Sequence, residues 1–144
     1  AAVAHALLSL GAQSLSIVDT DEARAETLAH GLSGRFAGRP VQHVRDACAA
    51  IAAADGLVNA TPIGMTGHPG VPVDPACLQP RHWVAEVVYF PLQTELLQEA
   101  TQRGCRTLDG GGMAVWQAVA AFELFTGRAP DAQRMERHFR SMVS

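Results

Sequence analysis

The stretch "LVNATPIGM", residues 57–65, runs from four strand-like positions into a turn that holds Thr61, Pro62, Gly64 and Met65. A short apolar run bounded by turn residues is typical of a buried strand, and glycine and proline are the strongest local signals for a turn. The stretch therefore predicts a strand that delivers a mixed polar and apolar turn to one end of a sheet.

Strand and helix patterns alternate on both sides of this stretch. Strands separated by helices over this length indicate parallel pairing with right-handed crossovers, and hence a doubly wound, Rossmann-like α/β fold with helices on both faces of the sheet. The predicted strands cover residues 15–18, 41–44, 56–60, 82–90 and 105–108, and the predicted helices cover residues 1–10, 21–34, 46–54, 91–104, 113–127 and 130–143.

Several helix ends carry recognisable signals. Asp46 is placed to cap one helix, and the next predicted helix has Pro91 at its first position and Gly104 at its end. The helix over 113–127 is apolar nearly all round, which predicts burial. The first helix lacks a capping residue, so we expect the chain to begin inside a helix that follows a missing segment.

Composition limits the possible functions. The 144 residues suit one compact domain, and the net charge of −3 provides no basic surface for nucleic acid or for a membrane. The three cysteines lie far apart without C-x-x-C spacing, and the six histidines lack close pairing, so no metal site is predicted. We expect a cytoplasmic protein whose partner is a small molecule; the sequence carries no signal for oligomeric state.

In a parallel sheet all the turns that follow strands gather at one edge, where ligands bind. The unusual residues of this chain fall in those turns. They are Asp19 after the strand over 15–18, the turn over 61–65, Tyr89 at the end of the longest strand, and "DGGGM" over 109–113. The pattern predicts four turns converging on one crevice.

Asp19 has two readings. A carboxylate at the end of this strand can accept hydrogen bonds from both hydroxyls of an adenosine ribose and repel a 2′-phosphate, which favours NAD over NADP. It can equally cap the helix that starts near Asp21. Thr20 adds no positive charge, and only Arg24, one helical turn further on, is placed to meet a phosphate.

The glycines of "DGGGM" also have two readings. Three residues without side chains allow the backbone to approach a flat ring, but such a run is also typical of a tight turn into a helix.

Several motifs in order resemble one family over essentially the whole chain. They are "VNATPIGM" (58–65), "VVYFPLQTELLQEA" (87–100), "GC.TLDGGGMAVWQAVAAFELFTG" (104–127) and the terminal "PD...M" (130–135). This set resembles the nucleotide-binding C-terminal domain of the shikimate dehydrogenase family and is most similar to its quinate/shikimate dehydrogenase branch. In that family a glycine-rich phosphate loop precedes the helix that here opens with Ala1, and that loop and its strand are absent from this sequence.

The resemblance implies roles for residues at matching positions. The "ATPIGM" turn would lie under the nicotinamide ribose as an apolar shelf that excludes water. The backbones of Val87 and Gly110 would hold the carboxamide beside Met113, and Tyr89 and Gln117 would face the substrate. Read without the family, Tyr89 is a core aromatic and Gln117 a partnered polar residue. The implied coenzyme contacts are Asp19, Thr20, Arg24, Thr61, Pro62, Ile63, Met65, Val87, Gly110 and Met113.

Departures from the family pattern refine these expectations. NADP-using members resemble "NRT..R", so Asp19 and Thr20 replace the Asn and the first Arg, whereas Arg24 matches the second. NAD is therefore expected, with NADP possible. Glu86 stands where Asp is common, and Gly111 stands where many shikimate-specific members carry Leu, which weakens any inference about the preferred acid.

No catalytic residue is expected in this chain. Family members use a Lys and Asp pair from an N-terminal substrate domain, but this chain contains no lysine, and arginine cannot act as an acid or base near neutral pH. The resemblance implies NAD-linked oxidation of a ring hydroxyl of shikimate or quinate by the parent protein, with the chain alone inactive. The alternatives are an NADP-dependent shikimate dehydrogenase of aromatic amino acid biosynthesis and a non-catalytic nucleotide sensor.

Overall fold

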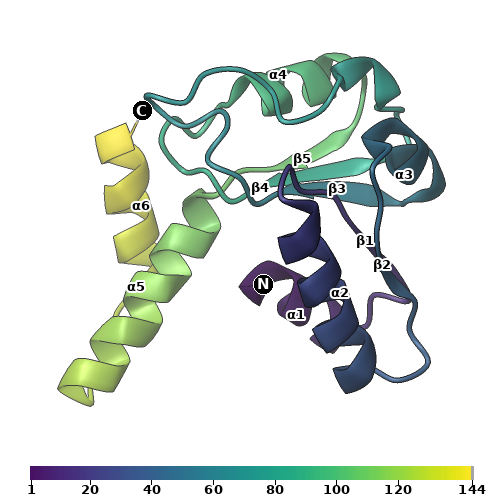
Figure 1. The fold of residues 1–144 in the computed structure, drawn as a ribbon. Helices are drawn as coiled ribbons and strands as arrows, with labels where there is room; N and C mark the ends of the chain where they lie inside the picture. The colour runs from purple at the N-terminus through teal and green to yellow at the C-terminus, as the bar shows by residue number, and fades with distance from the viewer. Residues whose placement is uncertain (144) are drawn as a thin grey trace. The chain divides into compact units, whose positions relative to one another are not determined.

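The computed structural model describes residues 1–143 and has an α/β fold whose strands all pair in parallel. Its ribbon is shown in Figure 1. The chain divides into two compact units, Ala1–Ala53 (the N-terminal unit) and the chain from Ala54 onward (the C-terminal unit). Each unit is described by itself below.

The N-terminal unit pairs two short strands. Its elements in chain order are α1 (Ala2–Ser9), β1 (Leu15–Ile17), α2 (Glu22–Arg35), β2 (Val41–His43) and α3 (Ala47–Ala53). β1 and β2 run parallel with Leu15 opposite Val41 and Ile17 opposite His43. A buried apolar stripe on α2 supplies three of the core residues, and α1 and α3 supply one each. The core consists of Leu8, Ala25, Ala29, Leu32 and Ile51.

Two aspartates begin helices in this unit. Asp21 accepts a hydrogen bond from the Arg24 amide and caps α2. Asp46 accepts from the Ala49 amide at 2.9 Å, which confirms the predicted cap of α3. Each bond satisfies one of the amides that a helix start leaves without an internal partner.

The C-terminal unit contains a three-stranded parallel sheet in the order β3–β4–β5. Figure 1 shows α4 running over this sheet, while α5 and α6 lie side by side. The core between sheet and helices includes Val84, Leu96, Leu97 and Val115. The elements are β3 (Gly56–Asn59), the short 3-10 helix η1 (Pro75–Cys77), β4 (Trp83–Glu86), α4 (Glu95–Gln102), β5 (Arg106–Leu108), α5 (Gly111–Thr126) and α6 (Ala132–Val143).

Two predicted boundaries are wrong. The predicted strand over 82–90 ends at Glu86, and α4 begins at Glu95 rather than at Pro91. Thr94 is the true N-cap, because its hydroxyl accepts the Leu97 amide at 3.3 Å. The apolar residues between strand and helix form a turn instead of extending either element.

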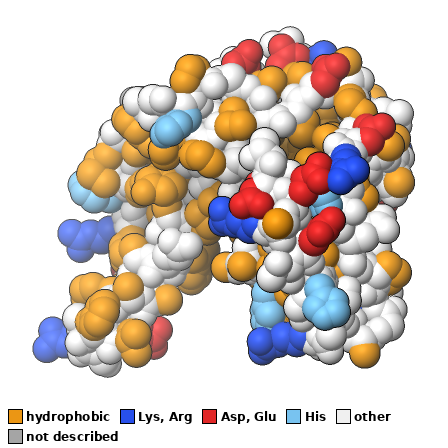
Figure 2. All heavy atoms as spheres, in the orientation of Figure 1, with side chains coloured by type: hydrophobic (Ala, Val, Ile, Leu, Met, Phe, Trp, Pro, Cys, Tyr) orange, Lys and Arg blue, Asp and Glu red, His pale blue; other side chains and the backbone are white. Residues whose placement is uncertain are grey.

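The predicted burial of the helix over 113–127 is also wrong. Only Gly111, Val115 and Val119 of α5 are buried, whereas Trp116, Leu124 and Phe125 are 63%, 80% and 83% exposed. Figure 2 shows apolar side chains gathered on the surface where this helix lies. Within this chain, one side of α5 packs in its unit and the other side is exposed.

None of the helices in the described part of the chain combines the length and the apolar character that a bilayer span requires.

Candidate functional site

Three of the four predicted turns meet at the carboxyl ends of β3, β4 and β5. The Thr66 amide donates to the Phe90 carbonyl at 3.1 Å, which ties the turn after β3 to the segment after β4. The glycine run after β5 approaches that segment as well, since a Cβ added at Gly110 would lie 2.3 Å from the Val88 carbonyl oxygen. The C-terminal unit therefore presents one joined edge made of three turns.

The turn over 61–65 exposes most of its side chains. Thr61 and Pro62 are exposed, Met65 is 38% exposed, and Ile63 is half-buried. Gly64 has a φ of +97°, a conformation that favours glycine, and its amide donates to the His68 carbonyl at 2.7 Å. The turn is thus an ordered surface with apolar side chains available to a ligand.

A buried polar pair underlies this turn. Asn59 ends β3 and lies opposite Glu86 at the end of β4. Its Nδ2 donates to Glu86 Oε1 at 2.9 Å and to Oε2 at 3.2 Å. Burial raises the pKa of the Glu86 carboxyl, and hydrogen bonds from Asn59, the Val88 amide and Thr94 oppose that rise. Two polar side chains in the sheet interior thus support the edge.

The glycine run is explained mainly by the protein's own packing. Gly110 is closed in by the carbonyls of Val87 and Val88, and a Cβ at Gly111 would meet Leu92 at 2.8 Å. Around Gly112, by contrast, nothing lies within 4 Å of an added Cβ. The carbonyl of Gly110 already accepts the Ala114 amide at 3.1 Å. The tight turn into α5 accounts for the first two glycines, and only the third leaves open space.

The remaining predicted residues of this unit lie on the same turns or at the start of α5. Val87 follows β4 directly, and its amide donates to the Asn59 carbonyl at 3.0 Å. Tyr89 is 48% exposed, and its ring centroid lies 6.2 Å from that of Phe139 on α6, so it is not the core aromatic of the alternative reading. Met113 is half-buried and Gln117 is exposed.

Asp19, Thr20 and Arg24 belong to the N-terminal unit, after the carboxyl end of β1. Asp19 is exposed, and its Oδ1 accepts the Asp21 amide at 3.0 Å. Asp21 rather than Asp19 caps α2, so the capping alternative for Asp19 is wrong. The Asp19 carboxylate shapes the turn with one oxygen.

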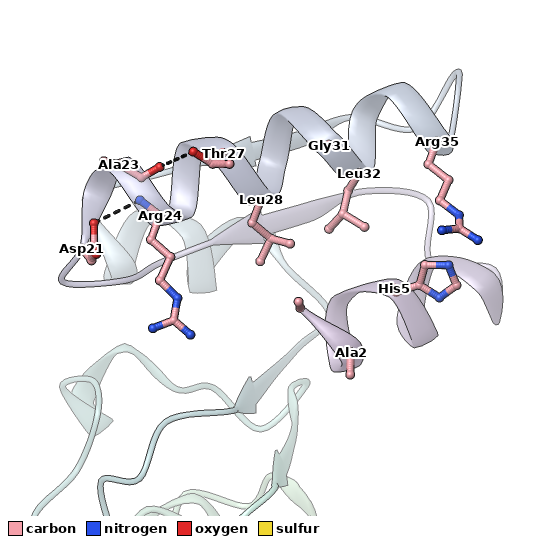
Figure 3. Close-up of a pocket in the computed structure, with 11 residues that line it drawn as sticks. Ala2, His5, Asp21, Ala23, Arg24, Thr27, Leu28, Gly31, Leu32 and Arg35 are labelled. Atoms are coloured by element: carbon pink, nitrogen blue, oxygen red, sulfur yellow. Dashed lines mark hydrogen bonds between the residues drawn. The ribbon is translucent and has the colours of Figure 1, made fainter.

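Arg24 borders an open groove of about 920 Å³ between α1 and α2. Figure 3 shows Arg24, Leu28 and Leu32 directed from α2 toward this space and Arg35 at its other end. Apolar side chains of α2 line the groove, and the Asp21 carboxylate lines it together with the Arg24 and Arg35 guanidinium groups.

No group of three or more histidine, cysteine or acidic residues in residues 1–143 is arranged to hold a metal ion. Chemically, the two units offer an exposed carboxylate, a guanidinium and an apolar turn, which are groups that bind and orient rather than react. Sequence reasoning missed the Asn59–Glu86 pair. Its signal was one polar residue at the end of each of two otherwise apolar strands.

Comparison with known proteins gives consistent matches. A family model described as the Shikimate 5'-dehydrogenase C-terminal domain matches residues 110–138. A quinate/shikimate dehydrogenase (NAD(+)) of Corynebacterium efficiens is 51% identical over 144 residues, covering 98% of this chain and 50% of that protein. A shikimate dehydrogenase (NADP(+)) of Streptomyces avermitilis is 56% identical over 137 residues, covering 94% of this chain and 47% of that protein.

A solved structure matches equally well. Quinate dehydrogenase from Corynebacterium glutamicum in complex with NAD superimposes with a TM-score of 0.89 at 49% identity, over 97% of this chain and 50% of that one. The chain thus spans about half the length of the curated relatives it matches.

Proposed function

The chain belongs to the shikimate dehydrogenase family, and we propose that it is the NAD-binding domain of a quinate/shikimate dehydrogenase. The protein that contains it would reversibly oxidise the ring hydroxyl of shikimate or quinate to 3-dehydroshikimate or 3-dehydroquinate. We place this protein in the cytoplasm. The observation that carries the proposal is the edge formed by three turns of the C-terminal unit, which offers exposed apolar side chains and a glycine with open space around it.

The edge fits the nicotinamide half of the coenzyme. Ile63 and Met65 offer apolar surface, Gly112 leaves open space at the start of α5, and Tyr89 adds a half-exposed phenol. In this proposal Thr61, Pro62, Ile63 and Met65 support the ring and ribose, Val87, Gly110 and Met113 line the carboxamide end, and Tyr89 and Gln117 orient the substrate. When bound, the coenzyme supplies hydride acceptance and donation. The apolar turn would exclude water from that path.

Proton transfer is assigned to the part of the protein outside this chain. The chain contains no lysine, and the residues on the edge bind and orient ligands rather than exchange protons. The Lys and Asp pair implied by the family resemblance would come from an N-terminal substrate domain. The isolated chain would then bind coenzyme without turnover.

NADP use is the second candidate. Arg24 is exposed on the first turn of α2, shortly after Asp19, and a relative named as NADP(+)-dependent is 56% identical. A guanidinium would attract a ribose phosphate, whereas the Asp19 carboxylate would repel it. We favour NAD because the Asp19 carboxylate follows β1, where an acidic side chain accepts hydrogen bonds from the ribose hydroxyls in dinucleotide-binding folds.

Replacing Asp19 with Asn in the full-length protein tests coenzyme choice. The amide keeps an acceptor for the Asp21 amide but loses the charge. We expect NAD to bind at least about 10-fold more weakly, because a charged hydrogen bond contributes roughly 1.5–3 kcal/mol. NADP should bind as tightly as before or more tightly. Fluorimetric titration with both nucleotides measures the ratio.

Asp46→Asn is the matched control, because the Asp46 carboxylate also accepts a backbone amide in the same unit but stands before α3 rather than after β1. It should leave the ratio unchanged. Tighter binding of NADP than of NAD by the unmodified protein would contradict the NAD assignment.

A further inference from the structure

We propose that Asn59 and Glu86 are positioning residues for the coenzyme, because their buried hydrogen bonds fix the 61–65 turn in the conformation that receives it. The inference rests on the proposed function for the identity of the ligand. The placement of the turn itself rests on contacts within the C-terminal unit.

A single side chain, that of Asn59, holds the start and the middle of the turn. Asn59 Oδ1 accepts the Thr61 amide at 3.0 Å and the Thr61 hydroxyl at 2.7 Å. Asn59 Nδ2 donates to the Ile63 carbonyl at 2.9 Å. The Thr61 hydroxyl in turn accepts the Ile63 amide at 3.1 Å. The start and the middle of the turn are therefore bound to the last residue of β3.

Glu86 fixes the orientation of that amide. Asn59 and Glu86 are 2% and 5% exposed and lie directly opposite each other in the sheet. The carboxylate accepts from Asn59, so the nitrogen of Asn59 must face β4 and its oxygen must face the turn. If the amide were reversed, its oxygen would face the carboxylate and the Thr61 amide would lose its acceptor. Glu86 thus sets which groups of the turn Asn59 can bind.

The pair also connects the turn to α4. Glu86 accepts from the hydroxyl of Thr94 and from the Val88 amide. Thr94 is 1% exposed and caps α4, and it lies 3.4 Å from the position of a Cβ at Gly64. Three elements therefore share one buried network, and such networks define a unique conformation when every member is satisfied.

The experiment uses Asn59→Asp, Glu86→Gln and the double variant in the full-length protein. Asn59→Asp sets two carboxylates against each other, whereas Glu86→Gln sets an amide nitrogen against the donors around it. The double variant restores one donor and one acceptor across the pair. Two readouts are needed: hydrogen exchange of the amides of Thr61 and Ile63 without nucleotide, and the Kd for NAD.

We expect each single variant to speed exchange at both amides at least 10-fold and to weaken NAD binding at least 10-fold, with partial recovery of both in the double variant. Cys105→Ala is the control, since Cys105 is buried immediately before β5, at the other end of the strands. It should lower overall stability while leaving turn exchange and NAD affinity unchanged.

Failure of the inference and failure of the proposed function give different results. Unchanged exchange at Thr61 and Ile63 in both single variants overturns the inference, whatever the NAD result. Faster exchange with unchanged NAD affinity overturns the proposed nicotinamide placement, and with it the role of the pair toward the coenzyme. The same outcome in the Cys105→Ala control as in the single variants also overturns the inference, because the effect would then be general destabilisation.

Discussion

At the scale of single residues, the glycine run shows how differently adjacent glycines are used. Gly110 is enclosed by backbone carbonyls, whereas Gly112 has open space around it. Gly110→Ala should destabilise the chain by at least about 2 kcal/mol, because the backbone has to shift to accept a methyl group. Gly112→Ala should stabilise it by about 0.5–1 kcal/mol, since alanine favours the helix. Urea unfolding measures both; equal effects would contradict this packing.

His82 leads to a prediction about pH. It is 1% exposed, its Nδ1 accepts the Gln79 amide at 3.0 Å, and burial together with the charge of Arg81 lowers its pKa below the ordinary 6.5. The unfolded chain therefore binds a proton at higher pH than the folded chain does. The stabilising contribution is complete above about pH 6.5 and is lost as the pH falls through that value toward the folded pKa.

Unfolding midpoints in urea at pH 7.5 and pH 5.5 test this expectation. Each pKa unit between the two states corresponds to about 1.4 kcal/mol. His82→Asn keeps an acceptor for the Gln79 amide but cannot titrate, so its stability should fall less between the two pH values. If the variant's stability depended on pH as strongly as that of the original chain, the assignment of the effect to His82 would be wrong.

The roles of residues could be predicted from the sequence where their partners are neighbours in the chain, but not where their partners are distant in the chain. The cap at Asp46 follows from its position before an apolar run, and it is confirmed. The Asn59–Glu86 pair joins residues 27 positions apart, and only strand register brings them together. The reason for Gly110 likewise depends on the approach of the turn after β4.

At the scale of elements, α5 shows that an apolar composition does not determine which residues are buried. Its composition is apolar on all sides, but packing covers only the side that carries Val115 and Val119. Periodicity cannot reveal which side of such a helix is covered. Similarly, the end of β4 could not be predicted from the apolar residues that follow it, because a strand and a tight turn can share that composition.

Adjacent residues on α5 should respond oppositely to truncation. Val115→Ala should cost the 144-residue chain roughly 1.5–3 kcal/mol, from lost burial and the cavity left behind. Trp116→Ala should change stability by no more than about 0.5 kcal/mol, because the side chain is largely exposed. Chemical denaturation measures both. A larger loss from Trp116→Ala than from Val115→Ala would contradict the orientation of the helix.

At the scale of the whole molecule, the α/β class and the parallel pairing were predictable from alternation alone and are confirmed. The shared edge of three turns follows from the same rule, since parallel strands end on one side of a sheet. Asp19 belongs to the other unit, so its part in the same crevice stays a prediction. Side-chain roles at the edge also stay predictions, because they depend on the ligand.

The methionines provide the most direct test of the central claim, that the edge of the C-terminal unit receives the nicotinamide. The chain has four methionines, and methyl-labelled full-length protein reports on each of them by NMR. On addition of NAD, the methyl signals of Met65 and Met113 should shift and show contacts to nicotinamide protons, while Met135 and Met142 on α6 should not change. Unchanged Met65 and Met113 signals at saturating NAD would contradict the account.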